Sequence, residues 1–267
     1  PCLSTKFVGQ PFHGLRILSS CCDEKSLLIT GSCDRDIRLW HVDENGFQFL
    51  DCVYGSTDGT HSLCFGNCGS KSVVFSGGAK RSLIAWELFE NRLFLLKEFQ
   101  LDQFGIETKV NFTVNCCALV NVKDQSFLYL GCSDGFLNVF KYDVDSNSKH
   151  IKLIDRKEMK GTPTSIDACD DKIVVSQSTG DLFFELAGND GEVGSEVNIS
   201  KCGIMMVRLL KVSSIDSEEK IIVASSCDDG KIILTDFVNQ TELFKFNGNH
   251  SGGIRSLAVN VNEGGDG

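Results

Sequence analysis

The chain has 267 residues and a formal net charge of −10, because 36 Asp and Glu outnumber 26 Lys and Arg. A hydrophobic content of 42% excludes a disordered chain, which lacks the apolar residues that form a core. No apolar stretch approaches the roughly 20 residues that cross a bilayer, and the first residues show no signal-peptide pattern. The negative charge disfavours a protein that collects phosphate backbones by overall attraction.

Five segments along the chain repeat one pattern: an apolar run, small residues, a tight turn and an alternating apolar run. This pattern predicts a β-hairpin with a two-residue turn rich in Gly and Asp. The second turn residue falls at Arg35, Arg81, Gly135, Gly180 and Gly230. Their spacing, between 45 and 54 residues, is typical of the blades of a β-propeller. The segments are residues 27–40, 73–86, 127–140, 172–185 and 221–234.

A shorter strand precedes each hairpin and an outer strand follows it, which gives four strands per blade. We therefore predict an all-β propeller with less than about 10% helix, because helical periodicity and caps are nearly absent. The blades span about 9–53, 57–100, 111–155, 161–199 and 202–247, and a sixth begins at 248–267. The chain starts without Met and stops within that sixth repeat. We expect a fragment of a longer multi-propeller protein, whose other parts supply the remaining blades.

Thirteen cysteines raise the question of disulfides or a metal site. Their number is odd and no CxxC pair occurs, while Cys64, Cys68 and nearby His61 come closest to a ligand cluster. Small buried hydrophobes in a reducing compartment explain these cysteines better. We therefore expect free thiols, a cytoplasmic location, and neither a metal nor a cofactor.

The first hairpin resembles the repeats of the WD-repeat family. His13 lies 27 residues before Trp40, and Asp34 lies between Thr30 and Trp40 at that family's spacing. The resemblance implies a structural tetrad, in which the turn Asp bonds the His, the His bonds the Thr, and the Thr bonds the Trp indole. A buried polar chain of this kind is stable only when every member is satisfied, so these residues are expected to be scaffold. The other blades depart from the tetrad, with Lys80, Phe140, Glu185 and Thr235 at its places.

Segments 75–86, 132–137 and 251–257 resemble a group within that family: the regulators of the tRNA 2′-O-ribose methyltransferase that modifies the anticodon wobble nucleotide. This resemblance implies a non-catalytic scaffold that binds the methyltransferase, meets tRNA through it, and does not insert into a membrane. Two alternatives stay open. One is a WD-repeat adaptor in signalling or vesicle traffic without an RNA partner, and the other is an enzyme with its active site in the central channel. The enzyme is disfavoured, because the chain has no GxxxxGK[ST], GxSxG or HExxH motif.

Cations and one imidazole are predicted to gather on one rim of the disc. The hairpin turns and the starts of the inner strands face this rim in a propeller, and we align Arg16 with His61 at the strand starts. Exposed Arg side chains at such a rim are typical partner anchors. The candidate partner-binding residues are Arg16, Arg35, His61, Lys80, Arg81 and Arg255. As alternatives, Lys80 merely caps a turn that has lost its Asp, and the basic run 152–160 is either a charged outer loop or a phosphate contact.

Overall fold

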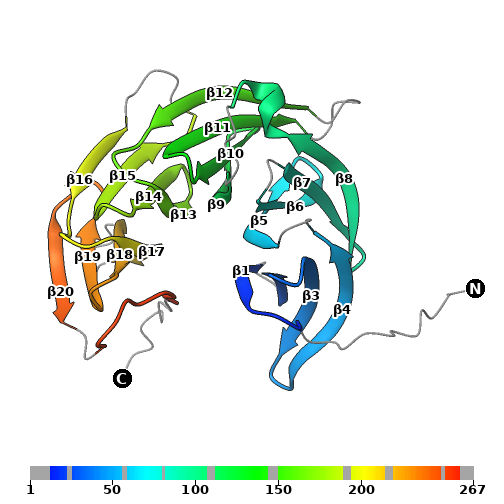
Figure 1. Cartoon of the computed structure of the whole chain (residues 1–267), viewed down its shortest axis with the longest axis horizontal. Coiled ribbons are helices and arrows are strands. Elements are labelled where there is room, and N and C mark those ends of the chain that lie inside the picture. The colour runs from blue at the N-terminus through cyan, green and yellow to red at the C-terminus, as the bar shows by residue number, and fades with distance from the viewer. Residues whose placement is uncertain are drawn as a thin grey trace, which may run out of the picture.

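The computed structural model describes residues 13–22, 26–55, 59–79, 82–106, 112–143, 150–188, 194–213, 219–247 and 250–258. Within these ranges, twenty strands form five four-stranded antiparallel sheets, the blades of the propeller (Figure 1). The only helical element in the described ranges is the 3-10 turn η1 (Leu101–Phe104), so the prediction of an all-β propeller is confirmed. Among the same residues, no helix has the length and hydropathy needed to cross a membrane.

The strands of each sheet pair in chain order. Blade one contains β1 (Ile17–Cys22), β2 (Leu27–Ser32), β3 (Asp36–Asp43) and β4 (Gly46–Tyr54). Blade two contains β5 (Thr60–Cys68), β6 (Lys71–Gly78), β7 (Ser82–Phe89) and β8 (Arg92–Gln100). Blade three contains β9 (Val114–Val122), β10 (Gln125–Cys132), β11 (Phe136–Asp143) and β12 (His150–Glu158). Blade four contains β13 (Pro163–Cys169), β14 (Lys172–Gln177), β15 (Asp181–Leu186) and β16 (Ser195–Asn198). Blade five contains β17 (Ile204–Ser213), β18 (Glu219–Cys227), β19 (Lys231–Asp236) and β20 (Glu242–Asn247).

The five blades follow one another round an arc, with the first strand of each blade facing the axis (Figure 1). Blade one and blade five flank the open side of this arc. Residues 250–258 lie beside blade five, where the Ile254 N–H donates to Cys227 O at 3.2 Å and Ser226 Oγ donates to Ile254 O at 2.9 Å. These residues form no strand, so the described part of the predicted sixth repeat is held by single hydrogen bonds and not by a ladder.

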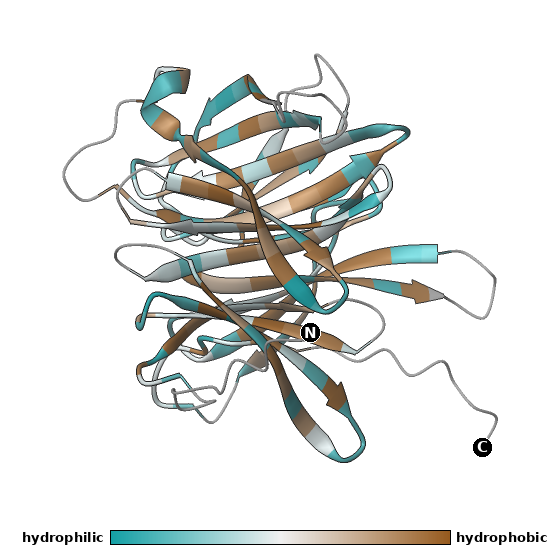
Figure 2. Ribbon diagram, turned by 90° about the vertical axis from the view of Figure 1, so that its right-hand side faces the viewer, coloured by the Kyte–Doolittle hydropathy of each residue, from teal (hydrophilic) through white to brown (hydrophobic). Residues whose placement is uncertain are grey.

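Burial on both faces of the sheets holds neighbouring blades together. In β10, Leu128 and Leu130 pack toward blade two, whereas Phe127 and Tyr129 pack toward blade four, and all four are at most 4% exposed. Successive side chains of a strand point to opposite faces, so one strand serves two junctions. Four apolar clusters fill the four junctions between consecutive blades. Figure 2 shows the same arrangement, with apolar residues along the strands and hydrophilic residues toward the turns.

In blades one, three, four and five, the turn between the second and third strands has three residues and not the predicted two. The corresponding turn of blade two includes residues outside the described ranges. In blade one the Arg35 N–H donates to Ser32 O at 3.1 Å, and Arg35 adopts a φ of 77°. Gly135, Gly180 and Gly230 take the same place with φ between 80° and 90°. A turn that ends in one left-handed residue matches the twist of the flanking strands, and glycine accepts that φ without strain.

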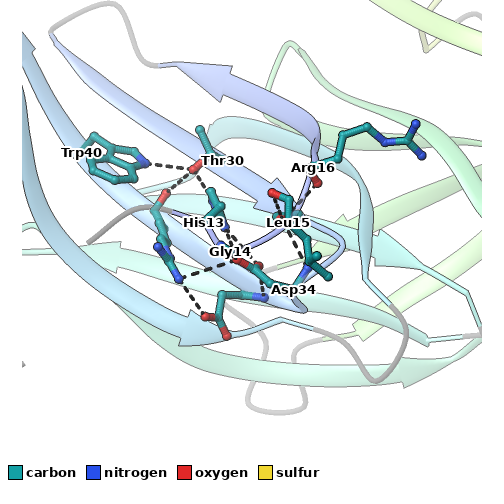
Figure 3. A network of polar contacts seen from close by, with 10 residues as sticks. His13, Gly14, Leu15, Arg16, Thr30, Asp34 and Trp40 are labelled. Carbon is teal, nitrogen blue, oxygen red and sulfur yellow. Dashed lines mark hydrogen bonds and ion pairs between the residues drawn. The ribbon is translucent and has the colours of Figure 1, made fainter. Parts of the chain in front are cut away.

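Figure 3 shows the polar chain of blade one. His13 Nδ1 donates to the Asp34 carboxylate at 2.9 Å, and the Gly14 N–H donates to the same carboxylate at 2.9 Å. The carboxylate has no proton to give, so His13 Nε2 is left to accept a hydrogen bond from Thr30 Oγ1 at 2.8 Å. Trp40 Nε1 in turn donates to Thr30 Oγ1 at 2.8 Å. This network fixes the hairpin turn against the segment that leads into β1.

Blades three and four lack a complete tetrad, and an acidic residue at one tetrad position of each blade forms an ion pair instead. Asp134, the turn acid of blade three, binds Arg156 of β12 at 3.2 Å. Glu185, which stands at the Trp place of blade four, binds Lys157 of blade three at 2.6 Å. Burial raises the pKa of Glu185, and the hydrogen bond from Lys157 offsets part of that rise. The second pair therefore joins two blades as well as filling a tetrad place.

We predict that Asp34→Ala lowers the free energy of unfolding by about 1–3 kcal/mol, because it leaves the His13 ring without its acceptor. Burial alone would raise the pKa of Asp34, but hydrogen bonds from His13 and two backbone N–H groups lower it. The stabilisation is therefore lost as the pH falls through the folded-state pKa of Asp34. Urea denaturation measures the loss.

The matched control is Asp229→Ala, which removes the turn acid of blade five. Its carboxylate is bound by the partly exposed Lys231, so its removal is expected to cost less. Equal losses in the two variants would contradict a special role for the His13 network.

Candidate functional site

A β-bulge recurs near the start of every inner strand. The ladder between the first and second strands skips one residue in each blade. Such bulges redirect a side chain and are frequent beside functional sites. The skipped residues are Leu18, His61, Asn115, Thr164 and Met205. The prediction that Arg16 aligns with His61 is therefore wrong, because the pairing of β1 puts Leu18 at that position and Arg16 two residues earlier.

Backbone hydrogen bonds hold Arg16 in its own position at the start of blade one. Its carbonyl accepts the Cys33 N–H at 3.0 Å and Ser32 Oγ at 3.0 Å. In Figure 3 the Arg16 side chain extends away from the polar chain of His13 and Asp34. The tetrad thus positions the backbone that carries Arg16 and leaves its guanidinium outside the network.

Side chains at the start of the inner strands also tie one blade to the next. Ser19 Oγ donates to Thr60 O of blade two at 3.2 Å. Asn115 Nδ2 donates to Pro163 O of blade four at 3.1 Å, and Thr164 Oγ1 donates to Ile204 O of blade five at 2.6 Å. Two of these donors are bulge residues. The bulges therefore bring the inner strands into register around a common opening.

A hollow of about 630 Å³ lies where the five inner strands converge. It is lined by residues from all five strands and by the segment beside blade five. Three arginines and one histidine line it, and no Asp or Glu is among its lining residues in the described part of the chain. We call this set of Arg16, His61, Arg208 and Arg255 the cationic mouth.

The other predicted rim residues do not join the cationic mouth. Arg35 is exposed in its turn and does not line the hollow. Lys80 and Arg81 lie outside the described residues. Arg208, which is not among the predicted rim residues, lines the hollow from β17. Its sequence signal is a single cation inside the otherwise apolar run of residues 204–210.

The arginines of the cationic mouth form no ion pair within the described residues, although one carboxylate, that of Asp167, lies near Arg208. None of the ion pairs there involves Arg16, Arg208 or Arg255. Burial lowers the pKa of His61, and the nearby charge of Arg16 lowers it further. Asp167 lies close enough to Arg208 for that arginine to lower its pKa, although burial raises the pKa overall. The hollow therefore gathers three arginines, one of them partly offset by Asp167, in a chain of net negative charge.

The basic run 152–160 belongs largely to strand β12 and not to a loop. Three of its four cations are held by acids: Arg156 by Asp134, Lys157 by Glu185, and Lys160 by Glu196 at 3.4 Å. Side chains that are paired in this way are less available to a phosphate. The run therefore contributes ion pairs that connect neighbouring strands and neighbouring blades.

Twelve of the thirteen cysteines lie in the described part of the chain, and none of these forms a disulfide. In that same part, no group of three His, Cys, Asp or Glu side chains is arranged to hold a metal ion. Cys116 and Cys117 are among the residues that line the hollow. Burial raises the pKa of Cys116, so it stays a neutral thiol there.

Comparisons with solved structures find WD40 propellers. The WD40 β-propeller domain of Doa1 matches with a TM-score of 0.62 and 14% identity, covering 91% of this chain and 72% of that one. U3-55K matches with a TM-score of 0.67 and 16% identity, covering 88% of this chain and 65% of that one. The WD40 repeats of RRP9 match with a TM-score of 0.68 and 15% identity, covering 88% of this chain and 64% of that one.

These likenesses show a β-propeller fold like that of WD40 domains, of which the described residues form five blades. The chain spans about two thirds of the length of these structures. No protein-family model matches the chain, and no curated protein matches its sequence.

The His61 imidazole provides a test of the charge in the cationic mouth. Arg16→Gln is expected to raise the pKa of His61 part of the way to its ordinary value, because burial still lowers it. Arg35→Gln, which changes an exposed arginine outside the hollow, is expected to leave that pKa unchanged. NMR titration of the His61 ring carbons measures both. An unaltered pKa in Arg16→Gln would place the two side chains too far apart to act on one ligand.

The lowered pKa of His61 also determines the direction in which folding stability changes with pH. The unfolded state binds the proton first, at a pKa of about 6.5. The contribution of His61 to folding stability is therefore complete above that value and is lost as the pH falls toward the folded-state pKa.

We predict that iodoacetamide labels the exposed Cys22 before Cys64 and Cys116 in the folded protein. Burial shields the latter two and raises their pKa, so they carry little of the reactive thiolate. After unfolding without reductant, mass spectrometry is expected to find all thirteen cysteines labelled. A shortfall at that step would reveal disulfides and refute the expectation of a reducing compartment.

Proposed function

We propose that the chain is a non-catalytic scaffold that binds a partner protein at the cationic mouth. The observation that carries the proposal is a hollow lined by three arginines and no carboxylate, in a chain with a net charge of −10. Arginine anchors in a partly desolvated pocket supply much of the energy of protein interfaces. The likeness to WD40 domains supports a binding module, and the absence of any recognisable catalytic motif in the sequence agrees with it.

The partner that we propose is a tRNA 2′-O-methyltransferase in the cytoplasm, which modifies the anticodon wobble nucleotide. The support is the resemblance of segments 75–86, 132–137 and 251–257 to regulators of that enzyme. The catalytic residues then belong to the enzyme, and this chain contributes binding and orientation. Holding enzyme and substrate in one geometry removes part of the entropic barrier of their encounter.

Capture of the full-length protein from cells tests the proposal, with identification of the protein and the RNA that accompany it. A methyltransferase is expected in the complex, and cells without the gene are expected to lose wobble 2′-O-methylation. Complete methylation in those cells would overturn the tRNA assignment. Capture of signalling or vesicle-coat proteins without RNA would instead support a WD-repeat adaptor of the other kind.

Charge reversal tests the surface separately. Arg16 and Arg255 are exposed in the free chain, and a bound partner would bury them. Arg16→Glu combined with Arg255→Glu is therefore expected to weaken partner capture by about thirtyfold, as for the loss of arginine anchors that an interface covers. Arg35→Glu changes the charge of an exposed arginine outside the hollow and is the matched control. If both variants capture the partner as well as the wild type does, the partner binds elsewhere.

A further inference from the structure

The chemistry of the cationic mouth indicates the kind of group that it receives. Its arginines come from three places that are far apart in the sequence: residue 16 before β1, residue 208 in β17, and residue 255 beside blade five. Arginine presents a planar fork of N–H donors that suits a carboxylate or a phosphate. A ligand whose oxygens face these donors would be held from several blades at once.

The lack of ion-pair partners in the cationic mouth, among the described residues, also favours an anionic ligand. Elsewhere in the described residues, Arg38 and Arg156 are held by aspartates, whereas Arg16, Arg208 and Arg255 have no ion-pair partner there. The ring of His61 is half-buried among them, and its lowered pKa leaves it largely neutral at pH 7. An entering anion supplies the missing negative charge, and it also favours protonation of His61.

The size and lining of the hollow favour a peptide over a nucleic acid. A volume of about 630 Å³ is within the range of sites that enclose a small ligand or a few side chains. Among the described residues, no Phe, Tyr or Trp on which successive bases would stack lines the hollow. RNA also brings one negative charge per nucleotide toward a chain of net charge −10, whereas a peptide needs to bring only one or two.

We infer that the cationic mouth binds an acidic side chain, either a carboxylate or a phosphorylated hydroxyl, carried by an extended peptide segment of the partner. This inference rests on the proposed function of the chain as a scaffold and names the chemistry of its partner. The arginines bind the anionic oxygens, and His61 gains a proton as the anion enters. Apolar residues that line the hollow, Ile17 and Leu63 among them, contact the stem of the side chain.

Four probes test the inference by fluorescence anisotropy with the full chain. The first is a labelled octapeptide of glycine and serine with two central glutamates. The second carries glutamines in their place, the third carries phosphoserines, and the fourth is a six-nucleotide oligouridine. The glutamate or the phosphoserine peptide is expected to bind at least about tenfold more tightly than the glutamine peptide and the RNA. Binding of the phosphoserine peptide alone identifies a phosphorylated partner, and binding of both identifies an acidic one.

Variants locate the binding. Arg16→Gln and Arg255→Gln are each expected to lower the affinity for the acidic peptide by about tenfold. The control variants Arg35→Gln and Arg92→Gln are expected to leave this affinity unchanged. Arg255 lies outside every strand, so its replacement keeps the test valid if Arg16→Gln disturbs blade one. Thermal melting of each variant checks the fold. In NMR titrations of the wild type, the bound peptide is expected to raise the pKa of His61.

Equal affinity for the glutamate and glutamine peptides, or tightest binding of the RNA, would overturn the inference. Equal weakening by the two control variants would also overturn it, because the effect would then be one of overall charge. If the peptides fail to bind while the full-length protein still captures its methyltransferase, only this inference fails. If the acidic peptide binds as expected and no methyltransferase is captured, the inference stands and the tRNA assignment fails.

Discussion

The structure depends on one constraint: a blade has two apolar faces and cannot bury either of them alone. Each junction between blades is filled by an apolar cluster drawn from both sides, as where Phe75 of blade two meets Tyr142 of blade three with ring centroids 4.9 Å apart. Stacking of this kind makes every blade depend on its neighbours. It also rotates successive sheets about an axis, and this rotation brings the inner strands together. The hollow and its cations are consequences of that convergence.

Polar groups then fix details that apolar packing leaves open. In blade one the His13 network holds the turn against the segment that carries Arg16. Blade two keeps part of this arrangement, since Trp86 Nε1 donates to Ser76 Oγ at 2.9 Å. Blades three and four hold the corresponding places with ion pairs. Equivalent positions are thus stabilised by hydrogen bonds in some blades and by ion pairs in others. This explains how blades with irregular repeat sequences keep a regular architecture.

The sequence contains most of the information for the fold and only part of it for the site. Turn residues at intervals of 45 to 54 positions, three of them glycine, and alternating apolar residues predict hairpins and blades, because both follow from local backbone geometry. The site depends on register. One skipped residue in each inner strand moves Arg16 out of alignment with His61, and no local pattern marks that residue. Arg208 could not be selected, because its neighbours in the hollow come from other blades. Arg35 was selected by its place in the turn, and the structure shows that this turn does not reach the hollow.

The alternation of Leu128 and Leu130 with Phe127 and Tyr129 has a consequence for how the chain tolerates change. In a sheet with one solvated face, a slip of one residue would bury polar side chains and expose apolar ones, so hydrophobicity enforces alignment. In β10 both sets are apolar, and such a slip would leave both junctions filled with hydrophobic groups. Alignment is enforced instead by the discrete hydrogen bonds of turns and bulges, such as that from the Gly135 N–H to Cys132 O at 3.2 Å. Exchange of one apolar residue for another within a strand therefore preserves the architecture. A single inserted residue beside a turn displaces every side chain of that strand, whatever its hydrophobicity.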